Sequence, residues 1–158
     1  MAIRKIVTMG DEVLRKKSRP VVNFNEKLWQ LLDDMKDTMN KAEGVGLAAV
    51  QVGVLRRVIV IDVGDGLMEL INPEIIEVSG EQEGQEGCLS VPGRWGIVKR
   101  PNYVKLRAQN RKGQWKLYEG TELKARAFCH EIDHLDDTLY VDVETKELTA
   151  DEILAERN

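Results

Sequence analysis

Apolar residues recur at a helical period near the start of the chain and in short, separated runs further along it. Between residues 25 and 42 they lie three and four positions apart, which predicts an amphipathic helix. Asn25 is placed to cap the start of this helix and Gly44 to terminate it. A stripe of Leu and Met on one helix face usually packs into the core, so we assign no chemistry to it. The stripe consists of Leu28, Leu31, Leu32, Met35 and Met39.

Several short runs of β-prone residues lie between Leu47 and Lys116, and glycine, asparagine and proline separate them. Such runs predict short, largely antiparallel strands. They are residues 57–62, 70–71, 75–78 and 103–107.

The helical pattern returns from about Thr121 to Leu135, and Thr149-Ala150-Asp151-Glu152 has the form of a capping box for a short last helix. The order of these patterns predicts an α+β fold, in which short, mainly antiparallel sheets pack around a central helix. An N-terminal amphipathic helix precedes the sheets, and a short C-terminal helix follows them. Since the chain has 158 residues, we expect residues 1–158 to form one domain.

The charge pattern excludes some partners. The formal net charge is -4, and lysine and arginine are scattered along the chain, which argues against direct binding of nucleic acid. Asp11 and Glu12 interrupt the N-terminal segment before it is long enough for a signal peptide or a membrane span. We therefore expect a cytoplasmic protein that does not enter a membrane. Reducing conditions there oppose a disulfide between Cys88 and Cys129.

The strongest chemical signal is the segment His130-Glu131-Ile132-Asp133-His134 on the predicted central helix. Two histidines four positions apart project from one helix face, which is the spacing at which two imidazoles bind one metal ion. In metal hydrolases with this pattern, the glutamate between them is the general base. His130 and His134 are also the only histidines of the chain. The pattern predicts a metal-dependent hydrolase.

A hydrolytic metal site usually has three protein ligands, and the residues alone leave the third one open. One set of options is the acidic residues downstream of the helix. These are Asp142, Glu144 and Glu147. The other option is Cys88, whose segment has glycine and proline on both sides and could bring a thiolate to the metal from outside the helix. Cys129 lies about 100° round the helix axis from His130, so we interpret it as a packed core thiol.

Three segments together resemble the signature motifs of bacterial peptide deformylases, in the order and at the separations usual in that family. They are Gly44-Val45-Gly46-Leu47-Ala48-Ala49-Val50-Gln51-Val52-Gly53, Glu86-Gly87-Cys88-Leu89-Ser90 and His130-Glu131-Ile132-Asp133-His134. The resemblance extends over nearly the whole chain. It implies removal of the formyl group from the N-terminal formylmethionine of new polypeptides, with release of formate and a free amine.

By this resemblance, Cys88, His130 and His134 would bind one divalent metal ion. Fe(II) is common in the family, and the same ligand set would also accept Zn(II), Ni(II) or Co(II). Glu131 would act first as general base and then as general acid.

The resemblance also implies donors for the formyl oxygen and a pocket for the methionine side chain. Gln51 would donate from its side-chain amide and Leu89 from its backbone N–H, which stabilises the charge that develops on that oxygen. The pocket and the peptide contacts would come from Val45, Gly46, Leu123, Ala127 and part of His130, with Glu86 nearby. For Leu123 and Ala127, the helical period fits an ordinary core stripe equally well.

Three positions depart from the commonest family pattern. Cys129 stands where many members have glutamine, Val50 replaces a frequent proline, and Asp137 follows the helix where glycine is usual. Aspartate can adopt the left-handed conformation expected at that position at a cost of about 1 kcal/mol. We also expect an ion pair between Arg100 and Asp133 that fixes the helix.

The rival functions are an HExxH metallopeptidase with a different third ligand, a zinc-stabilised interaction module and a catalytically degenerate deformylase relative. Glu131 argues against the interaction module, which needs no glutamate beside its ligands. The expected partners are an N-formylmethionyl peptide or nascent chain and, transiently, the ribosome. We expect a monomer. The sequence leaves open the metal bound in the cell and the preference for residues beyond the methionine.

Overall fold

The computed structural model describes residues 2–149 and 151–152. The two α-helices in this part of the chain are α1 (Glu26–Lys41) and α2 (Leu123–Leu135). The strands are β1 (Gly46–Ala48), β2 (Val58–Ile61), β3 (Met68–Ser79), β4 (Gln82–Cys88), β5 (Val91–Arg100), β6 (Tyr103–Gln109), β7 (Trp115–Thr121) and β8 (Glu144–Glu147). Short 3-10 helices cover η1 (Glu12–Arg15), η2 (Ala49–Val52) and η3 (Tyr140–Asp142).

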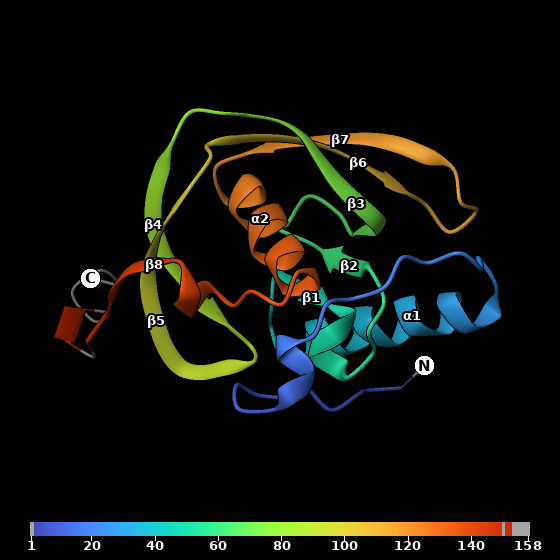
Figure 1. Cartoon of the computed structure of the whole chain (residues 1–158), viewed down its shortest axis with the longest axis horizontal. Coiled ribbons are helices and arrows are strands. Elements are labelled where there is room, and N and C mark those ends of the chain that lie inside the picture. The colour runs from blue at the N-terminus through green and yellow to red at the C-terminus, as the bar shows by residue number, and fades with distance from the viewer. Residues whose placement is uncertain (1, 150, 153–158) are drawn as a thin grey trace.

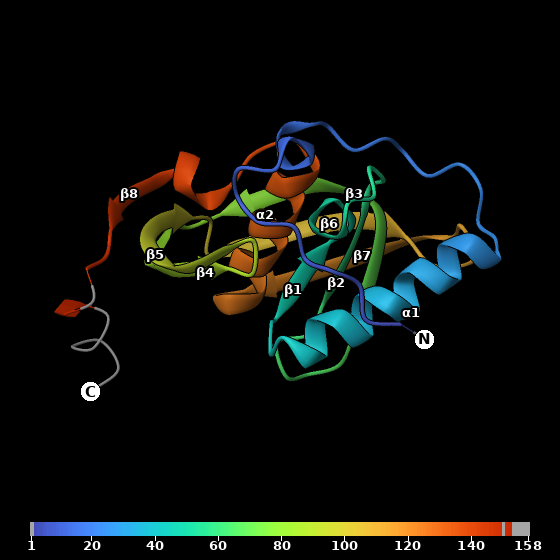
Figure 2. The same cartoon turned by 90° about the horizontal axis from the view of Figure 1, so that it is seen from below.

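The strands form two antiparallel sheets, one with the order β1-β2-β3-β6-β7 and one with the order β4-β5-β8. Helix α2 lies between the two sheets, and α1 lies beside β1 and β2 on the side away from α2 (Figures 1 and 2). This arrangement confirms the predicted α+β fold, with antiparallel sheets around a central helix. It places α2 where residues from both sheets can reach it.

Strand β2 shows why the sequence has four apolar residues in a row. Ile59 and Ile61 pack into the core cluster that contains α2, whereas Val58 and Val60 pack into the cluster that contains α1. Because successive side chains point to opposite faces of a strand, both faces of β2 are buried and no position is left for a polar residue.

Helix α1 begins as the sequence predicts, since the Asn25 side chain accepts a hydrogen bond from the backbone N–H of Leu28. Its end differs from the prediction. Glu43, and not Gly44, takes the left-handed conformation, with a φ of 58°. The Gly44 N–H donates to the Met39 carbonyl and the Glu43 N–H to the Asn40 carbonyl, the two hydrogen bonds of a Schellman motif.

The strand boundaries also differ in part from the prediction. Residues 70–71 and 75–78 belong to one long strand, β3, which continues through a register shift between Ile71 and Glu74. The sequence pattern did not indicate β4 and β5 as strands, because glycine and proline within them hide the alternation of polar and apolar residues. Helix α2 covers the predicted segment and ends at Leu135 as predicted. It begins at Leu123, two residues after Thr121, because Thr121 still pairs with Tyr103 in the sheet.

The segment after α2 contains two of the predicted local features. Asp137, just past α2, has a φ of 60°, so aspartate adopts the predicted left-handed conformation. The Glu152 N–H donates to Thr149 Oγ1 at 3.2 Å and the Thr149 N–H donates to Glu152 Oε1 at 3.4 Å, which are the two hydrogen bonds of the predicted capping box. The rest of the predicted last helix lies outside the described residues. Within the described part of the chain, no helix combines the length and apolar character needed to cross a membrane.

Candidate active site and metal centre

The fold brings Cys88, His130 and His134 together. Cys88 is the last residue of β4, and both histidines project from the same face of α2. The ligand atoms of the three residues all lie within 4.8 Å of one another. Cys88 Sγ and His134 Nε2 are 3.3 Å apart, close to the separation of about 3.5 Å between sulfur and nitrogen ligands of a tetrahedral metal ion. The donor set therefore fits one divalent metal ion.

The acidic alternatives for a third ligand have other partners. Asp142 forms an ion pair with Arg15, and Glu144 and Glu147 form ion pairs with Arg94. Among the described residues, the metal-binding group contains no carboxylate beside the two histidines. The structure thus favours Cys88 over the acidic options that the residues alone left open.

Glu86 fixes the orientation of one candidate ligand. The His130 ring donates from Nδ1 to Glu86 Oε1 at 2.8 Å, and this hydrogen bond leaves Nε2 as the nitrogen that can bind a metal. Two arginines hold the same carboxylate: Arg100 by two hydrogen bonds of 2.9 and 3.0 Å, and Arg126 by one of 2.6 Å. Burial tends to raise the pKa of Glu86, but the hydrogen bonds from His130 and Arg100 outweigh it and lower the pKa to about 2.

Glu86 lies next to His130, part of which the family resemblance places at the methionine pocket. Its carboxylate is buried against His130 and the two arginines, with 5% of the residue exposed. Arg100 also donates to Asp133 at 2.7 Å, which confirms the predicted ion pair. Arg100, at the end of β5, therefore links β4 to α2 through Glu86 and Asp133.

Glu131 lies in a position suited to a general base. It is 4% exposed, and among the described residues nothing forms a hydrogen bond with its Oε1 atom. Burial raises its pKa to about 7. A Cβ atom at position 46 would lie 2.5 Å from Glu131 Oε2, so glycine at that position leaves room for this carboxylate.

Gln51 is buried beside Cys88 and is not a surface glutamine. Its Oε1 accepts a hydrogen bond from the Ala48 N–H at 2.9 Å, and this contact fixes the orientation of the amide. Its Nε2 donates to Ser90 Oγ at 3.0 Å and lies 3.5 Å from Cys88 Sγ. A Cβ atom at position 44 would lie 2.8 Å from Leu89 Cδ1. The segments 44–53 and 86–90 thus pack directly against each other at the metal centre.

The residues expected to contact methionine come from α2 and from the segment at the start of β1. Leu123 is 50% exposed, Ala127 only 5% and Val45 44%. Cys129, which points to a different side of the helix, is buried in the core, and burial raises its pKa to about 11. This confirms the interpretation of Cys129 as a packed thiol.

Sequence reasoning missed two polar residues of this site. Arg126 lies one helical turn before His130 and forms an ion pair with Glu86, and Ser90 accepts the hydrogen bond from Gln51. An arginine within the apolar stretch from Ala125 to Phe128 is the one signal that could have indicated a buried partner. Ser90 gives no such signal, because serine is common in loops.

The sequence and the fold of the chain both match known proteins. The sequence profile of the family described as Polypeptide deformylase matches residues 3–149. The chain belongs to this family. The peptide deformylase of Caldicellulosiruptor bescii is 55% identical over 158 residues, which cover 100% of this chain and 95% of that protein.

Solved deformylase structures have the same fold. The crystal structure of peptide deformylase from Thermotoga maritima matches with a TM-score of 0.89 at 40% identity, covering 90% of this chain and 98% of that chain. The one from Legionella pneumophila matches with a TM-score of 0.87 at 43% identity, covering 98% and 92%. As a deformylase, the chain is a metal-dependent hydrolase that removes the formyl group from the N-terminus of new polypeptides. These relatives give no support to a metallopeptidase or an interaction module.

Proposed function

We propose that Cys88, His130 and His134 hold one divalent metal ion, and that this ion is natively Fe(II). One thiolate and two imidazoles suit Fe(II) and also accept Zn(II), Ni(II) or Co(II), so metal availability decides between them. The observation that carries this assignment is the convergence of the three ligand atoms within 4.8 Å. Burial lowers the pKa of His134 well below its ordinary value, which keeps the ring in the neutral form that binds metals.

Glu131 is the proton carrier of the proposed reaction. When bound, a divalent cation at this centre lowers the pKa of water and polarises the formyl carbonyl. Glu131 takes the proton from the attacking water as the new C–O bond forms at the formyl carbon. It then gives the proton to the amide nitrogen of the methionine as the C–N bond breaks, so that formate and a free amine leave.

Gln51 and Leu89 stabilise the negative charge on the formyl oxygen. The Gln51 amide is held in place by its hydrogen bonds to Ala48 and Ser90, and Leu89 offers its backbone N–H from the segment that follows Cys88. Donors that are fixed before the reaction lose no energy in reorienting, and each is typically worth about 3 kcal/mol in the transition state of such hydrolases.

The methionine side chain lies against the exposed apolar surface of α2. Leu123 and Ala127 form one side of this subsite and Val45 the other, and the backbone of Gly46 hydrogen-bonds to the peptide. Because Val45 and Leu123 are 44% and 50% exposed, a bound methionine would remove apolar surface from water on both sides.

The test pairs the two cysteines of the chain. Cys88→Ser should lose both the metal and formate release from formyl-Met-Ala-Ser, measured without oxygen on Fe(II)-loaded protein, with the acetyl peptide as blank. Cys129→Ser should keep both, because its thiol lies in the core. A Cys88→Ser variant that retains metal and activity would overturn the ligand assignment and favour a different third ligand.

The remaining expectations concern the state of the protein in the cell. We propose that residues 1–158 form a single catalytic domain and that the protein is a cytoplasmic monomer. It encounters nascent chains while it is transiently associated with the ribosome, and it does not bind nucleic acid directly. The profile match over residues 3–149 supports one catalytic unit. Light scattering of the metal-loaded enzyme tests the monomer, and co-sedimentation with translating ribosomes tests the association.

A further inference from the structure

The N-terminal segment connects α1 to the proposed active site without forming a strand of either sheet. We call residues 2–9 the N-terminal strap. Figure 2 shows it in dark blue, running from beside α1 past β1 toward η1 and the end of α2. Near its far end, the Val7 N–H donates to the Gln51 carbonyl at 2.8 Å and the Met9 N–H donates to the Ser90 carbonyl at 2.7 Å.

These two carbonyls belong to the segments that supply the proposed donors for the formyl oxygen. Gln51 is itself one donor, and Ser90 directly follows the other, Leu89. Gln51 lies in η2, just after a strand of the five-stranded sheet, whereas Ser90 connects β4 to β5 in the three-stranded sheet. The strap therefore bridges the two sheets at the place where the two donors must keep a fixed separation.

Two buried residues of α1 hold the near end of the strap. The Asp34 carboxylate accepts hydrogen bonds from the Ala2 N–H and from Arg4 Nε, both at 2.9 Å. Thr38, one turn further along the helix, accepts one from the Arg4 N–H at 2.9 Å. Burial tends to raise the pKa of Asp34, but the hydrogen bonds from Gln30, Ala2 and Arg4 outweigh it and lower the pKa. The carboxylate is therefore charged at neutral pH.

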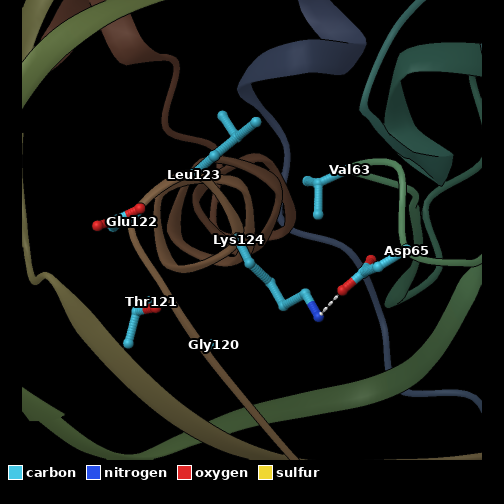
Figure 3. Close-up of a pocket in the computed structure, with 7 residues that line it drawn as sticks. All are labelled: Val63, Asp65, Gly120, Thr121, Glu122, Leu123 and Lys124. Atoms are coloured by element: carbon cyan, nitrogen blue, oxygen red, sulfur yellow. Dashed lines mark hydrogen bonds and ion pairs between the residues drawn. The ribbon is translucent and has the colours of Figure 1, made fainter.

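The burial of Asp34 makes this anchor firm. A contrasting ion pair lies at the start of α2, where Lys124 reaches across an open pocket to Asp65 (Figure 3). The Asp65 side chain is 53% exposed, and the Asp34 side chain only 5%. An exposed pair contributes little, because water competes for both charges, whereas breaking a buried pair leaves an uncompensated charge. The strap is therefore held at α1 by a contact that resists opening.

Freedom at this anchor would reach the donors, because the strap is short. Arg4 and Val7 are three positions apart, which is at most about 11 Å of chain. The side chains near the two ends of the strap pack little, since Ile3 is 51% and Met9 43% exposed. Hydrogen bonds therefore hold both ends, while Val7 between them packs on the core cluster that contains α2.

We propose that Asp34 and Thr38 are positioning residues for the reaction, which act through the strap on the segments of both donors. With the strap anchored, the side-chain amide of Gln51 and the backbone N–H of Leu89 keep the separation that the formyl oxygen requires. The inference rests on the proposed role of these two donors. Donors that are placed in advance stabilise the transition state more than the bound substrate, so the anchor acts on kcat and not on KM.

The test begins with Asp34→Asn, which removes the charge and keeps the size of the side chain. With formyl-Met-Ala-Ser it should lower kcat about five- to tenfold, and leave KM and Fe(II) content within about twofold of the unaltered protein. Thr38→Val should act in the same direction, and it replaces Asp34→Asn if that variant does not fold. Asp33→Asn is the control, because Asp33 lies beside Asp34 on α1 but pairs with Arg111. Unchanged kcat in the two anchor variants, or an equal loss in the control, would overturn the proposal.

A second substitution shows whether the effect passes through Gln51. In a Gln51→Ala background the side-chain donor is already absent, so Asp34→Asn should cost less than about threefold in kcat. The same loss in both backgrounds would indicate a general loss of structure and contradict the proposal. If Gln51→Ala alone keeps full kcat, the proposed role of Gln51 as a donor fails. If it loses kcat while Asp34→Asn does not, only the role of the strap fails.

Hydrogen exchange measures the strap directly. Amide N–H groups exchange faster where local opening becomes easier, so those of Val7 and Met9 should exchange at least about fivefold faster in Asp34→Asn than in Asp33→Asn. The amides of β2 should exchange at the same rate in both variants. Lost kcat with unchanged exchange at Val7 and Met9 would show that Asp34 acts by another route.

Discussion

Glu86 on β4 and His130 on α2 are joined by a hydrogen bond of 2.8 Å, in which the imidazole Nδ1–H donates to the carboxylate. Strand and helix belong to different parts of the fold, and this contact sets the tautomer and the plane of the ring. The carboxylate is itself held by Arg100 and Arg126. Orientation of a single proposed ligand therefore depends on residues from β4, β5 and α2.

The first prediction concerns this contact. Glu86→Gln should weaken metal binding by about 10- to 100-fold, because a neutral amide orients His130 less firmly and leaves two buried arginines with less negative charge. Competition with a chelator, measured on folded protein, gives the affinity. Glu83→Gln on the same strand is the control, because Glu83 is exposed. Equal metal affinities in the two variants would remove the positioning role of Glu86.

The second prediction concerns the stability of the ion-pair network. Arg100→Ala should lower the free energy of unfolding by about 3–5 kcal/mol, because it leaves the buried Glu86 carboxylate with one cation fewer. Urea unfolding of the protein measures the change. Arg107→Ala removes an exposed pair with Glu74 and an exposed contact with the Trp115 ring, and it should cost about 1 kcal/mol. A loss of similar size in both variants would show that Arg100 does not stabilise the network by its burial.

The third prediction separates chemistry from metal binding. Glu131→Gln should reduce kcat by about 10²- to 10⁴-fold, because an amide cannot take up and return the proton. Its metal content should equal that of the unaltered protein, and its thermal stability should not fall, since a neutral amide is easier to bury than a carboxylate. Glu81→Gln, at an exposed position, should leave all three properties unchanged. Retained turnover in Glu131→Gln would require another proton carrier.

The fourth prediction follows from the close approach of Gly46 to Glu131. Gly46→Ala should displace the Glu131 carboxylate, because the added Cβ atom would lie 2.5 Å from Oε2. We expect the loss of kcat to exceed the loss of thermal stability. Gly10→Ala tests the opposite case, since Gly10 has a φ of 109° and open space around it. That variant should lose stability through backbone strain and keep its kcat.

Much of this site could be predicted because its features are local in the sequence. The spacing of His130 and His134 fixes their common face once the helix is assigned, and Asn25 marks the start of α1 by a hydrogen bond three residues away. The left-handed backbone conformation of Asp137 was also predictable, because the residue that follows a helix often adopts it. These features depend on neighbours within one or two turns of a helix.

Other features depend on residues far apart in the chain, and the residues alone could not reveal them. The residues alone leave the third ligand open between Cys88 and three acidic residues, because the ion pairs of those acids with Arg15 and Arg94 join distant parts of the chain. The contact between Gly46 and Glu131 needs the packing of β1 on α2, which no local pattern encodes. The end of α1 was predicted at the wrong residue, because a glutamate at position 43 accepted the conformation usually left to glycine.

The positions of the proposed ligands have a consequence for folding. An ion bound by Cys88 and His134 would connect two residues 46 positions apart, and both cysteines of the chain are free of disulfides. Because such an ion binds the folded arrangement of its ligands and is lost when the chain unfolds, its binding free energy adds to the stability of the fold. Chelation would then remove one connection between β4 and α2 and lower the stability of the fold, while the hydrogen bonds of Glu86 to His130 and Arg126 still join the strand to the helix.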